Sequence, residues 1–520
     1  MRTSFRCRTS SASRLWVALL LWLGLVLPCT CGPQVLARPG WAGSGVTVET
    51  WWQRAVFYCL DPATFQDSNG DGRGDLGGVA QRMDYLQSLG VDAIILAPAA
   101  SSPQLSPADM SDGFDDLERQ ASLHHVRVLV ALDVSYLQPN SGGNGLLAAA
   151  RSWLTQGAAG FFLESSLLSD PQFSADLLHQ LRSLTSAFPG DRVLLSAAPP
   201  PENAALEPEL RREVQLIATP LLAGGDTPPT AATLRSQASE SINAAPSISS
   251  SRSRHVLSGL PLLAAARNLN VPNDQERGLL QRDLAVLMLA SRSAVLLGYG
   301  EELGLDPAAG NAPLMQWTPS NRTIPPAKPP EIPTDFDAIE YKAYTPYIAP
   351  LPRSLNPPPP QLPAAFVSEK PDPLTLPGFS SVSPDASLSG VAAPNGATAN
   401  VVTEDAEPDS LLNLYRHLIQ LHHQDPTLYD GAQLFLDHDA DDVLVWIRRP
   451  TPGARISTTV LAVCNLADHN LHLDLNGELR TLRAPSGDLR TLATGSPVPF
   501  QDSEDIVLPA GGAFLGEFSR

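Results

Sequence analysis

The chain of 520 residues is long enough for more than one domain, and its 43% hydrophobic and 17% charged residues are typical of a globular protein. Its formal net charge of −19 argues against nucleic-acid and anionic-membrane partners, because both require a basic surface. We therefore expect no nucleic-acid partner.

The N-terminus has the pattern of a secretory signal peptide. Residues 1–14 carry four arginines and no acidic residue, residues 15–28 are mostly apolar, and Val35–Ala37 offers small-residue spacing for cleavage. An uncleaved membrane anchor is the alternative, although about 20 apolar residues are needed to span a bilayer comfortably. The sequence predicts a signal peptide over residues 1–37, a secreted or periplasmic protein, and no membrane span once the leader is cleaved.

Two cysteines, Cys59 and Cys464, remain after this leader, and both lie in apolar segments that read as strands. In an exported protein they could form a disulfide, and the other interpretation is two buried free thiols. We favour the free thiols.

Short apolar runs alternate with helical patterns through the first 300 residues. The predicted strands cover residues 55–60, 91–98, 126–134, 157–165, 191–198, 214–222 and 293–300, and their count approaches eight. Amphipathic segments, such as residues 78–90 and 114–125, lie between them. Near-continuous apolar strands separated by helices indicate a parallel sheet covered on both faces, and their number favours a (β/α)8 TIM barrel. A doubly wound open sheet is the alternative, but no glycine-rich phosphate turn opens the first unit.

Residues 319–400 differ in kind from the rest of the chain. They contain PPAKPPEIP and LNPPPPQLP, followed by a run of small polar residues. Proline and small polar residues at this density do not build a packed core, so we expect a disordered excursion that interrupts a barrel domain of residues 48–427.

Structure is expected to resume with DSLLNLYRHLIQLHHQ, whose apolar spacing predicts an amphipathic helix. After Pro426 the pattern changes to alternating strands such as DDVLVWIRR and STTVLAVCNLA. We predict a C-terminal antiparallel β-sandwich over residues 428–520.

Residues 51–98 resemble the start of the alpha-amylase family of glycoside hydrolases, family 13, in its oligo-1,6-glucosidase, maltase and trehalose-synthase branch. They read WWQRAVFYCLDPATFQDSNGDGRGDLGGVAQRMDYLQSLGVDAIILAP. Three further matches follow in the family's order: GYGEELGL at Gly298–Leu305, APLMQWTPSNR at Ala312–Arg322 and EPDSLLNLYRHLIQL at Glu407–Leu421. The resemblance implies the (β/α)8 barrel, the β-sandwich, and retaining chemistry on an α-glucan or oligosaccharide.

Retaining hydrolysis needs a carboxylate nucleophile and a carboxylic acid/base about 5–5.5 Å apart. The resemblance places Glu164, in GFFLE, at the nucleophile position, where the family has an aspartate. The extra methylene shifts the carboxylate by roughly 1 Å, which can cost about a hundredfold in rate. Asp133 opens the third-strand motif and is a substrate-binding candidate, but Leu137 and Gln138 stand where the family has Asn and His.

The other family positions lack the expected chemistry. Phe162 replaces the orienting arginine, Ala197 replaces the acid/base, and Gly259–Pro261 replace the Asn-His-Asp motif of the seventh strand. Glu202, five residues after Ala197, is expected to be a surface residue. Loss of the acid/base alone typically forfeits about 10²–10⁴ in rate.

The segment at residues 137–153 is also short. It has no room for the small domain that active members insert there and that helps form the substrate pocket. The short segment and the lost catalytic residues are reminiscent of the heavy-chain subunits of heteromeric amino-acid transporters, which are non-enzymatic relatives of the same barrel. Those proteins, however, carry a membrane span and lack the acidic loop described next.

The loop DSNGDGRGD follows the first strand, where related enzymes carry calcium. Its predicted ligands are the side chains of Asp67, Asn69, Asp71 and Asp75 and the backbone carbonyl of Arg73. Oxygen donors that alternate with glycines suit a hard cation such as Ca²⁺. An acidic turn without an ion is the alternative, and in either case we expect the loop to serve the fold and not catalysis.

Two histidine pairs, His124–His125 and His422–His423, are predicted to be solvated helix residues and not metal ligands, because adjacent residues on a helix do not face one ligand.

Three functional hypotheses follow. The leading one is an exported family-13-like protein that binds carbohydrate, with a degenerate glycosidase centre. The second is an active α-glucosidase or transglycosylase that uses Glu164 as its nucleophile. The third is a non-catalytic scaffold subunit with an unidentified protein partner.

Overall fold

The computed structural model describes residues 51–97, 113–137, 143–198, 201–220, 230–243, 254–258, 274–305, 315–318, 399–436, 442–450, 458–467, 469–495 and 501–519. All of them belong to one compact unit, Glu49–Arg520. The predicted signal peptide falls in the other unit, Met1–Val48, and lies outside the described residues. Within the described ranges, no helix has both the length and the apolar character needed to cross a lipid bilayer.

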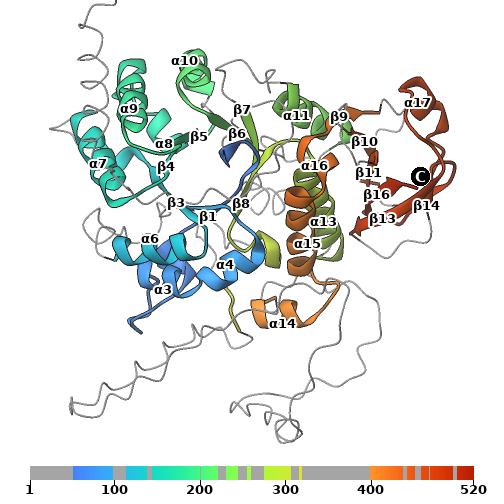
Figure 1. The fold of residues 1–520 in the computed structure, drawn as a ribbon, viewed down its shortest axis with the longest axis horizontal. Coiled ribbons are helices and arrows are strands. Elements are labelled where there is room, and N and C mark those ends of the chain that lie inside the picture. Colours follow the sequence, from blue (N-terminus) through green and yellow to red (C-terminus); the bar gives the residue numbers. More distant parts are fainter. Residues whose placement is uncertain are drawn as a thin grey trace, which may run out of the picture. The chain divides into compact units, whose positions relative to one another are not determined.

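Eight parallel strands close into a barrel in chain order (Figure 1). They are β1 (Val56–Leu60), β2 (Ala93–Leu96), β3 (Arg127–Leu132), β4 (Gly160–Leu163), β5 (Val193–Ser196), β6 (Leu216–Pro220), β7 (Arg254–Ser258) and β8 (Ala294–Gly298). Each strand pairs with the next, and β8 pairs with β1, so the ring has no open edge. The predicted (β/α)8 barrel is confirmed.

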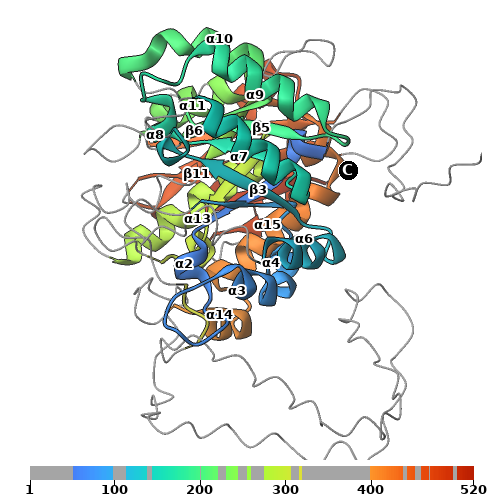
Figure 2. The same cartoon turned by 90° about the vertical axis from the view of Figure 1, so that its left-hand side faces the viewer.

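Helices cover the outside of the strands, and Figure 2 shows α7, α9 and α10 on one side of the barrel. The helices are α2 (Pro62–Phe65), α3 (Leu76–Gln81), α4 (Met83–Leu89), α6 (Phe114–Leu123), α7 (Gly143–Gln156), α8 (Ser165–Leu168), α9 (Ala175–Ala187), α10 (Glu207–Glu213), α11 (Ala231–Asn243), α13 (Asp274–Ala290), α14 (Val401–Ala406), α15 (Leu411–Gln424) and α16 (Pro426–Asp430). Short 3-10 helices are η1 (Trp51–Arg54), η2 (Val134–Tyr136), η3 (Pro201–Leu206) and η4 (Glu301–Leu303). The helix predicted over residues 78–90 is interrupted at Arg82, which ends α3 and precedes α4.

Alternate residues of the strands fill the barrel interior with apolar side chains. Phe57 and Cys59 from β1, Leu129 and Ala131 from β3, and Phe162 from β4 belong to one buried cluster. The other face of each strand packs against the helices in a second, larger cluster. This alternation is the layered interior expected of a closed barrel.

One glycine is required by the closeness of neighbouring strands. At Gly160, which begins β4, a Cβ atom would lie 1.9 Å from the carbonyl oxygen of Val193 on β5. Only a residue without a side chain fits between these backbones.

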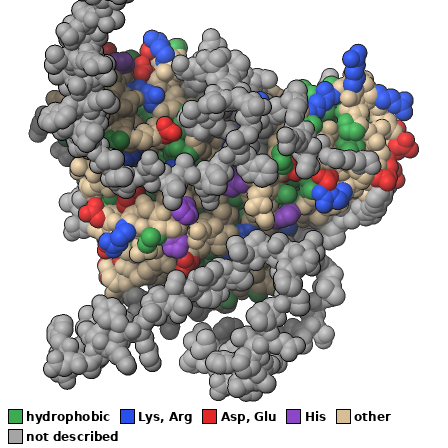
Figure 3. Space-filling view, viewed as in Figure 1, with side chains coloured by type: hydrophobic (Ala, Val, Ile, Leu, Met, Phe, Trp, Pro, Cys, Tyr) green, Lys and Arg blue, Asp and Glu red, His purple; other side chains and the backbone are tan. Residues whose placement is uncertain are grey.

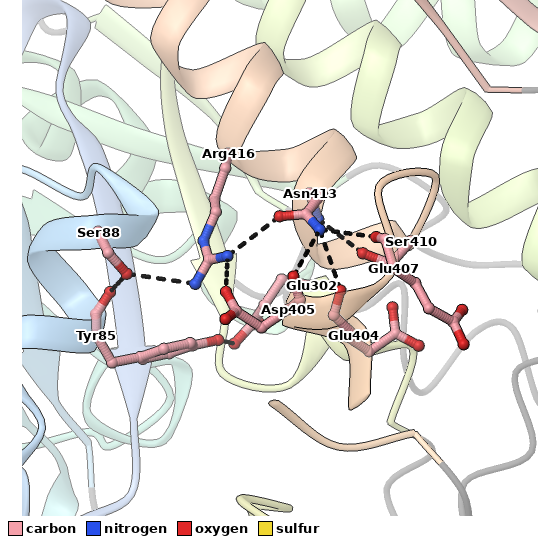
Figure 4. A network of polar contacts seen from close by, with 9 residues as sticks. All are labelled: Tyr85, Ser88, Glu302, Glu404, Asp405, Glu407, Ser410, Asn413 and Arg416. Atoms are coloured by element: carbon pink, nitrogen blue, oxygen red, sulfur yellow. Dashed lines mark hydrogen bonds and ion pairs between the residues drawn. The ribbon is translucent and has the colours of Figure 1, made fainter. Parts of the chain in front are cut away.

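Helix α15 forms where the apolar spacing predicts an amphipathic helix. Ser410 caps its first turn, because the Ser410 hydroxyl accepts a hydrogen bond from the Asn413 amide at 3.1 Å. Figure 4 shows how α14 is joined to it. The side-chain amide of Asn413 donates to the carbonyls of Glu404 (3.1 Å), Asp405 (3.4 Å) and Glu407 (2.7 Å). Arg416 forms an ion pair with Asp405, so the chain entering α15 is held by both charge and hydrogen bonds.

The two ends of the proline-rich excursion meet. The Val401 amide donates to the Gln316 carbonyl at 2.9 Å, and the Val402 amide donates to the Trp317 carbonyl at 3.2 Å. Asn400 accepts from the Thr403 amide at 3.1 Å and so begins α14. Residues 319–398 lie outside the described residues, but they leave and re-enter the fold at one point.

Trp317 anchors this point to the barrel. Its indole N–H donates to the Phe65 carbonyl at 2.8 Å, and its ring meets the Phe65 and Tyr85 rings at 5.2 Å each. The guanidinium of Arg82 lies 4.0 Å from the centre of the same ring, in a cation–π contact.

The C-terminal part is a six-stranded antiparallel sheet in the order β14-β13-β16-β11-β10-β9, with a two-stranded sheet of β12 and β15. Its elements are β9 (Ala432–Phe435), β10 (Val443–Arg449), β11 (Val460–Asn465), β12 (Leu471–Leu473), α17 (Asn476–Thr481), β13 (Asp488–Thr494), β14 (Gln501–Asp502), β15 (Ile506–Leu508) and β16 (Ala513–Phe518). One apolar cluster joins the inner faces of both sheets, as in a sandwich. The predicted antiparallel C-terminal domain is confirmed.

Charges of both signs are interspersed over the described part of the face shown in Figure 3. The large hydrophobic side chains that are exposed within the described residues are Leu123 on α6, Val134 on η2 and Val402 on α14. They lie on separate elements and form no common apolar patch.

Candidate functional site

Asp133 and Glu164 lie next to each other at the carboxyl ends of two neighbouring barrel strands. Leu132 of β3 pairs with Leu163 of β4, and the next residue on each strand carries the acidic side chain. The Glu164 amide donates to the Leu132 carbonyl at 3.0 Å, which fixes this register. Active sites of TIM barrels lie at this end of the strands.

Hydrogen bonds from Ser135 hold one oxygen of the Asp133 carboxylate. It caps η2 by accepting from the Ser135 amide at 3.0 Å, and the Ser135 hydroxyl donates to the same oxygen. Asp133 is half-buried, so its other oxygen remains available to a ligand hydroxyl.

Glu164 precedes α8 but makes no capping hydrogen bond to it. Burial, and then the negative charge of Asp133, raise the pKa of Glu164 to about 7. Tyr136 completes the group, and its pKa is raised to about 12 mainly by burial, with the two carboxylates adding to the effect. Near neutral pH, Glu164 is therefore only partly ionised.

Apolar side chains occupy the positions at which the resemblance expects catalytic groups. Phe162, at the arginine position, is 5% exposed and points into the barrel interior. Ala197 follows β5, at the acid/base position, and packs partly buried against the same interior cluster. Leu137 is buried. Gln138, Gly259–Pro261 and the side chain of Glu202 lie outside the described residues.

Cys59 lies inside the barrel, and Cys464 lies in the β domain, and both are free and buried. Burial, followed by the charges of Glu164, Asp61 and Glu301, raises the pKa of the Cys59 thiol well above its usual range. The interpretation of two free thiols is confirmed.

The loop Asp67–Asp75 is closed by its own hydrogen bonds. Asp67 is buried, and its carboxylate accepts from the amides of Asn69 (3.0 Å), Gly70 (2.7 Å) and Gly72 (2.8 Å). Burial opposes the charge, but these amides outweigh it and lower the pKa of Asp67. Gly70 and Gly72 have φ of 83° and 89°, a conformation that favours glycine.

The remaining predicted ligands also face the loop backbone. Asn69 accepts from the Asp71 amide, and Asp71 accepts from the Arg73 amide, each at 2.8 Å. Asp75 caps α3 by accepting from the Gly78 amide at 2.7 Å, and it accepts from the Ser68 hydroxyl at 2.8 Å. Within the described ranges, no three His, Cys, Asp or Glu side chains gather closely enough to hold a metal ion. The donor chemistry suits Ca²⁺, and each carboxylate has about four lone-pair sites, so these hydrogen bonds leave capacity for a cation.

A buried polar group that sequence reasoning missed lies behind the strand ends. Glu302, in η4 after β8, accepts from the hydroxyls of Tyr58 (2.7 Å) and Tyr85 (2.6 Å). Neither oxygen of the adjacent Glu301, which is 3% exposed, has a hydrogen-bond partner. Burial raises the pKa of both carboxyls, and for Glu302 the two tyrosines oppose that rise. The motif GYGEELGL could have indicated these acids. The tyrosines that donate to Glu302, however, come from β1 and α4, which are distant in the sequence.

The second histidine pair differs from the prediction. His422 is 1% exposed, with one ring nitrogen 2.8 Å from the Leu289 carbonyl and the other 3.2 Å from the Arg54 carbonyl. His423 lies 2.9 Å from the carboxylate of Asp92. The prediction that both are solvated was wrong, because α15 packs between α4 and α13.

Comparisons with known proteins agree with this architecture. The family described as Alpha amylase, catalytic domain, matches residues 60–117. Trehalose-6-phosphate hydrolase of Escherichia coli (strain K12) is 42% identical over 93 residues, which are 15% of this chain and 17% of that protein. Oligo-1,6-glucosidase of Bacillus sp. (strain F5) is 56% identical over 54 residues, 10% of this chain and 11% of that protein. The chain thus matches less than a fifth of the length of these relatives.

The structural likeness extends much further than the sequence likeness. Trehalulose synthase MutB from Pseudomonas mesoacidophila MX-45 superposes with a TM-score of 0.59 at 16% identity, over 90% of this chain and 99% of that protein. A mutant of the same synthase in complex with Tris gives a TM-score of 0.61 at 17% identity, over 90% and 100%. At such identities the likeness establishes the fold. Residues 60–117 thus match the alpha-amylase catalytic domain family, and the described chain shares the barrel and C-terminal β-domain fold of these solved structures.

Proposed function

We propose that this protein is an exported family-13 protein that binds α-glucosidic sugars and has little or no glycosidase activity. The observation that carries the proposal is Ala197, which follows β5 where the acid/base should stand. A methyl group can neither protonate a leaving oxygen nor activate water. Retaining hydrolysis requires both steps from one carboxyl group.

The surroundings of Glu164 support the same conclusion. A nucleophile must be ionised, and an adjacent cation would favour that form. Phe162 supplies no charge, and the proximity of Asp133 favours the protonated acid. About half of Glu164 is therefore neutral near pH 7, which lowers the fraction of protein with a usable nucleophile.

The same pair is suited to holding a sugar. A neutral carboxylic acid both donates and accepts a hydrogen bond, and a carboxylate accepts several. Asp133 and Glu164 together thus offer a donor and acceptors on adjacent strands, and sugar hydroxyls need both.

A binding and turnover experiment tests this proposal. Calorimetry with maltose and longer malto-oligosaccharides should show binding at millimolar ligand, and Asp133→Asn with Glu164→Gln should weaken it at least tenfold. Glu504→Gln, on an exposed turn of the β domain, is the matched control and should leave binding unchanged. Absence of heat with every sugar would remove the sugar site.

The alternative of an active α-glucosidase or transglycosylase is favoured by one observation. A carboxyl with a pKa of about 7 is matched to acid–base work near neutral pH. Maltose, isomaltose, sucrose, trehalose and an aryl α-glucoside should be incubated with the purified protein. Turnover that disappears in Glu164→Gln would establish this alternative and overturn the non-hydrolytic proposal.

A scaffold role with a protein partner receives no comparable support from the described surface, because its exposed hydrophobic residues are scattered. Absence of sugar binding, together with one specifically enriched partner, would favour it over the sugar-binding proposal.

Export rests on the pattern of residues 1–37. N-terminal sequencing of the mature protein should begin after Ala37. A mature protein that retains Met1 and sediments with membranes would instead support the uncleaved anchor.

We also propose that Asp67–Asp75 binds Ca²⁺ as a structural ion, held by Asp67, Asn69, Asp71, Asp75 and the Arg73 carbonyl. The support is the donor chemistry of the loop and its left-handed glycines. Chelation with EDTA should lower the melting temperature, and added Ca²⁺ should restore it. Asp71→Asn should abolish the response, and an unchanged melting temperature in the wild type would exclude the ion.

A further inference from the structure

The barrel and the β domain share one hydrophobic interface. Helix α13 packs against β11 and β16, and eight buried sheet residues join the barrel helices in a single cluster. These residues are Leu444, Trp446, Val460, Ala462, Cys464, Ala493, Ala513 and Leu515. They are at most 5% exposed, so this interface is largely closed to water.

A carboxyl group that has no hydrogen-bond partner among the described residues lies in this interface. Asp283 of α13 is 1% exposed, and neither of its carboxylate oxygens accepts a hydrogen bond. The thiol of Cys464 on β11 lies 3.7 Å from the Asp283 backbone carbonyl, which places the residue against the sheet. An ionised carboxylate buried without a donor or counter-charge is strongly unfavourable.

The nearby cations are engaged elsewhere. On β10, Arg448 donates to the carbonyls of Ala290 (2.8 Å), Gly431 (3.1 Å) and Leu428. On α13 itself, Arg282 donates to the Asp409 carbonyl and lies near the charges of Glu404 and Asp409.

The other neighbouring elements offer no counter-charge either. On α15, His422 contacts the carbonyls of Leu289 and Arg54, and burial lowers its pKa to about 4, so it is neutral. On β16, Glu517 pairs with Arg490. On β11, the Cys464 thiol is uncharged, because burial and then the Asp283 charge raise its pKa.

We propose that Asp283 is a proton-dependent latch between the barrel and the β domain: the docked interface holds it as a neutral acid, and loss of that proton loosens the packing of α13 on β11.

The direction of the pH effect follows from burial. Burial raises the pKa of Asp283 well above its usual value. In the unfolded chain the same group loses its proton near pH 4. Above that pH the folded state binds more protons than the unfolded state, so the free energy of unfolding falls as pH rises towards the folded pKa. At lower pH both states are protonated, and the group has no effect.

The test compares the full-length protein with Asp283→Asn, which is neutral at every pH. Hydrogen exchange of peptides from α13 and β11, corrected for intrinsic rates, should show protection in the wild type that falls as the pH rises above about 4. In Asp283→Asn the protection should stay constant, and the melting temperature should exceed that of the wild type at the upper pH. An equal pH dependence in both proteins would overturn the proposal.

Asp92→Asn is the matched control, because the pKa of Asp92 is shifted in the opposite direction to that of Asp283. Burial raises the pKa of Asp92, but His423 and the Val56 amide outweigh it and leave that pKa lowered. Asp92→Asn should therefore lower the melting temperature at neutral pH. If Asp283→Asn does not fold, infrared spectroscopy of wild-type protein with isotopically labelled aspartate decides, because the label separates aspartate bands from those of the buried glutamates: a protonated aspartate band that persists at pH 7 supports the latch, and its absence contradicts it.

Discussion

At the scale of single residues, the most informative feature is the pairing of Asp133 with Glu164. Register alone brings the two acids together, since each follows a pair of partnered leucines on neighbouring strands. Like charges this close favour a shared proton, and burial strengthens the effect. Glu164 therefore titrates near neutral pH, whether or not it has a catalytic role.

We predict that Glu164 titrates with a midpoint of about 7 and that Asp133→Asn lowers this midpoint. Removing the neighbouring negative charge makes ionisation easier, while burial keeps the pKa above its usual range. Difference infrared spectroscopy of the protonated carboxyl band measures both. The component of the band with this midpoint should vanish in Glu164→Gln and persist in Glu504→Gln. A midpoint that does not move in Asp133→Asn would show that the two acids are not coupled.

A second residue-scale prediction concerns Glu302. Replacement by Leu leaves the buried hydroxyls of Tyr58 and Tyr85 without their acceptor, and each unsatisfied group costs about 1–3 kcal/mol. We expect a loss of roughly 2–6 kcal/mol in the free energy of unfolding, measured by denaturant titration. The matched variant Tyr85→Phe removes one donor and keeps the ring, so its loss should be smaller. An equal loss in both variants would mean that the hydroxyls contribute nothing.

Sequence reasoning at residue scale depended on single motifs. Phe162 and Ala197 were assigned from their places in and after predicted strands, and the structure puts both beside the barrel interior. It failed for His422 and Glu302, whose surroundings are built by elements more than 100 residues away. No local pattern indicates which distant side chain will cover a residue.

At the scale of elements, the notable feature is the point where residues 319–398 leave and rejoin the fold. Backbone hydrogen bonds join Gln316 and Trp317 to α14, and Trp317 is anchored against Phe65, Tyr85 and Arg82. These contacts hold the two described segments that flank the excursion together. The sequence predicted the excursion from its composition, but it could not show that the ends meet.

We predict that replacing residues 319–398 with a linker of about eight Gly and Ser residues preserves the fold. Shortening a closed loop tenfold lowers its closure entropy cost by about 2 kcal/mol, so stability should be unchanged or slightly higher. Melting temperature and near-UV circular dichroism check this. Trp317→Ala, which leaves the length unchanged, should destabilise the protein by about 3–5 kcal/mol. A deletion variant that fails to fold would contradict the prediction.

At the scale of the whole molecule, the barrel and the β domain form one cooperative unit. They share a buried cluster, and Arg448 of β10 reaches from the sheet to the end of α13. The order of the domains was evident from the sequence, because a helical pattern is followed after Pro426 by the alternating pattern of β-strands. Their interdependence was not evident, since it rests on which face of the sheet meets α13.

We predict a single thermal transition for the whole described unit and a large shift of that transition in Arg448→Met. Arg448 is fully buried and donates to three carbonyls, and each hydrogen bond from a charged group contributes about 1.5–3 kcal/mol. Arg490→Met, at an exposed ion pair with Glu517, should cost at most about 1 kcal/mol. Scanning calorimetry distinguishes the outcomes. Two separate transitions, with only one shifted by Arg448→Met, would show that the domains unfold independently.

The two buried thiols report separately on the opening of the barrel and of the β domain. Cys59 reacts with an alkylating reagent only when the barrel opens, and Cys464 only when the β domain parts from α13. Peptide mapping separates the two rates in one sample of unmodified protein. Their ratio tells whether heat, acid or a sugar ligand acts first on the barrel or on its partner domain.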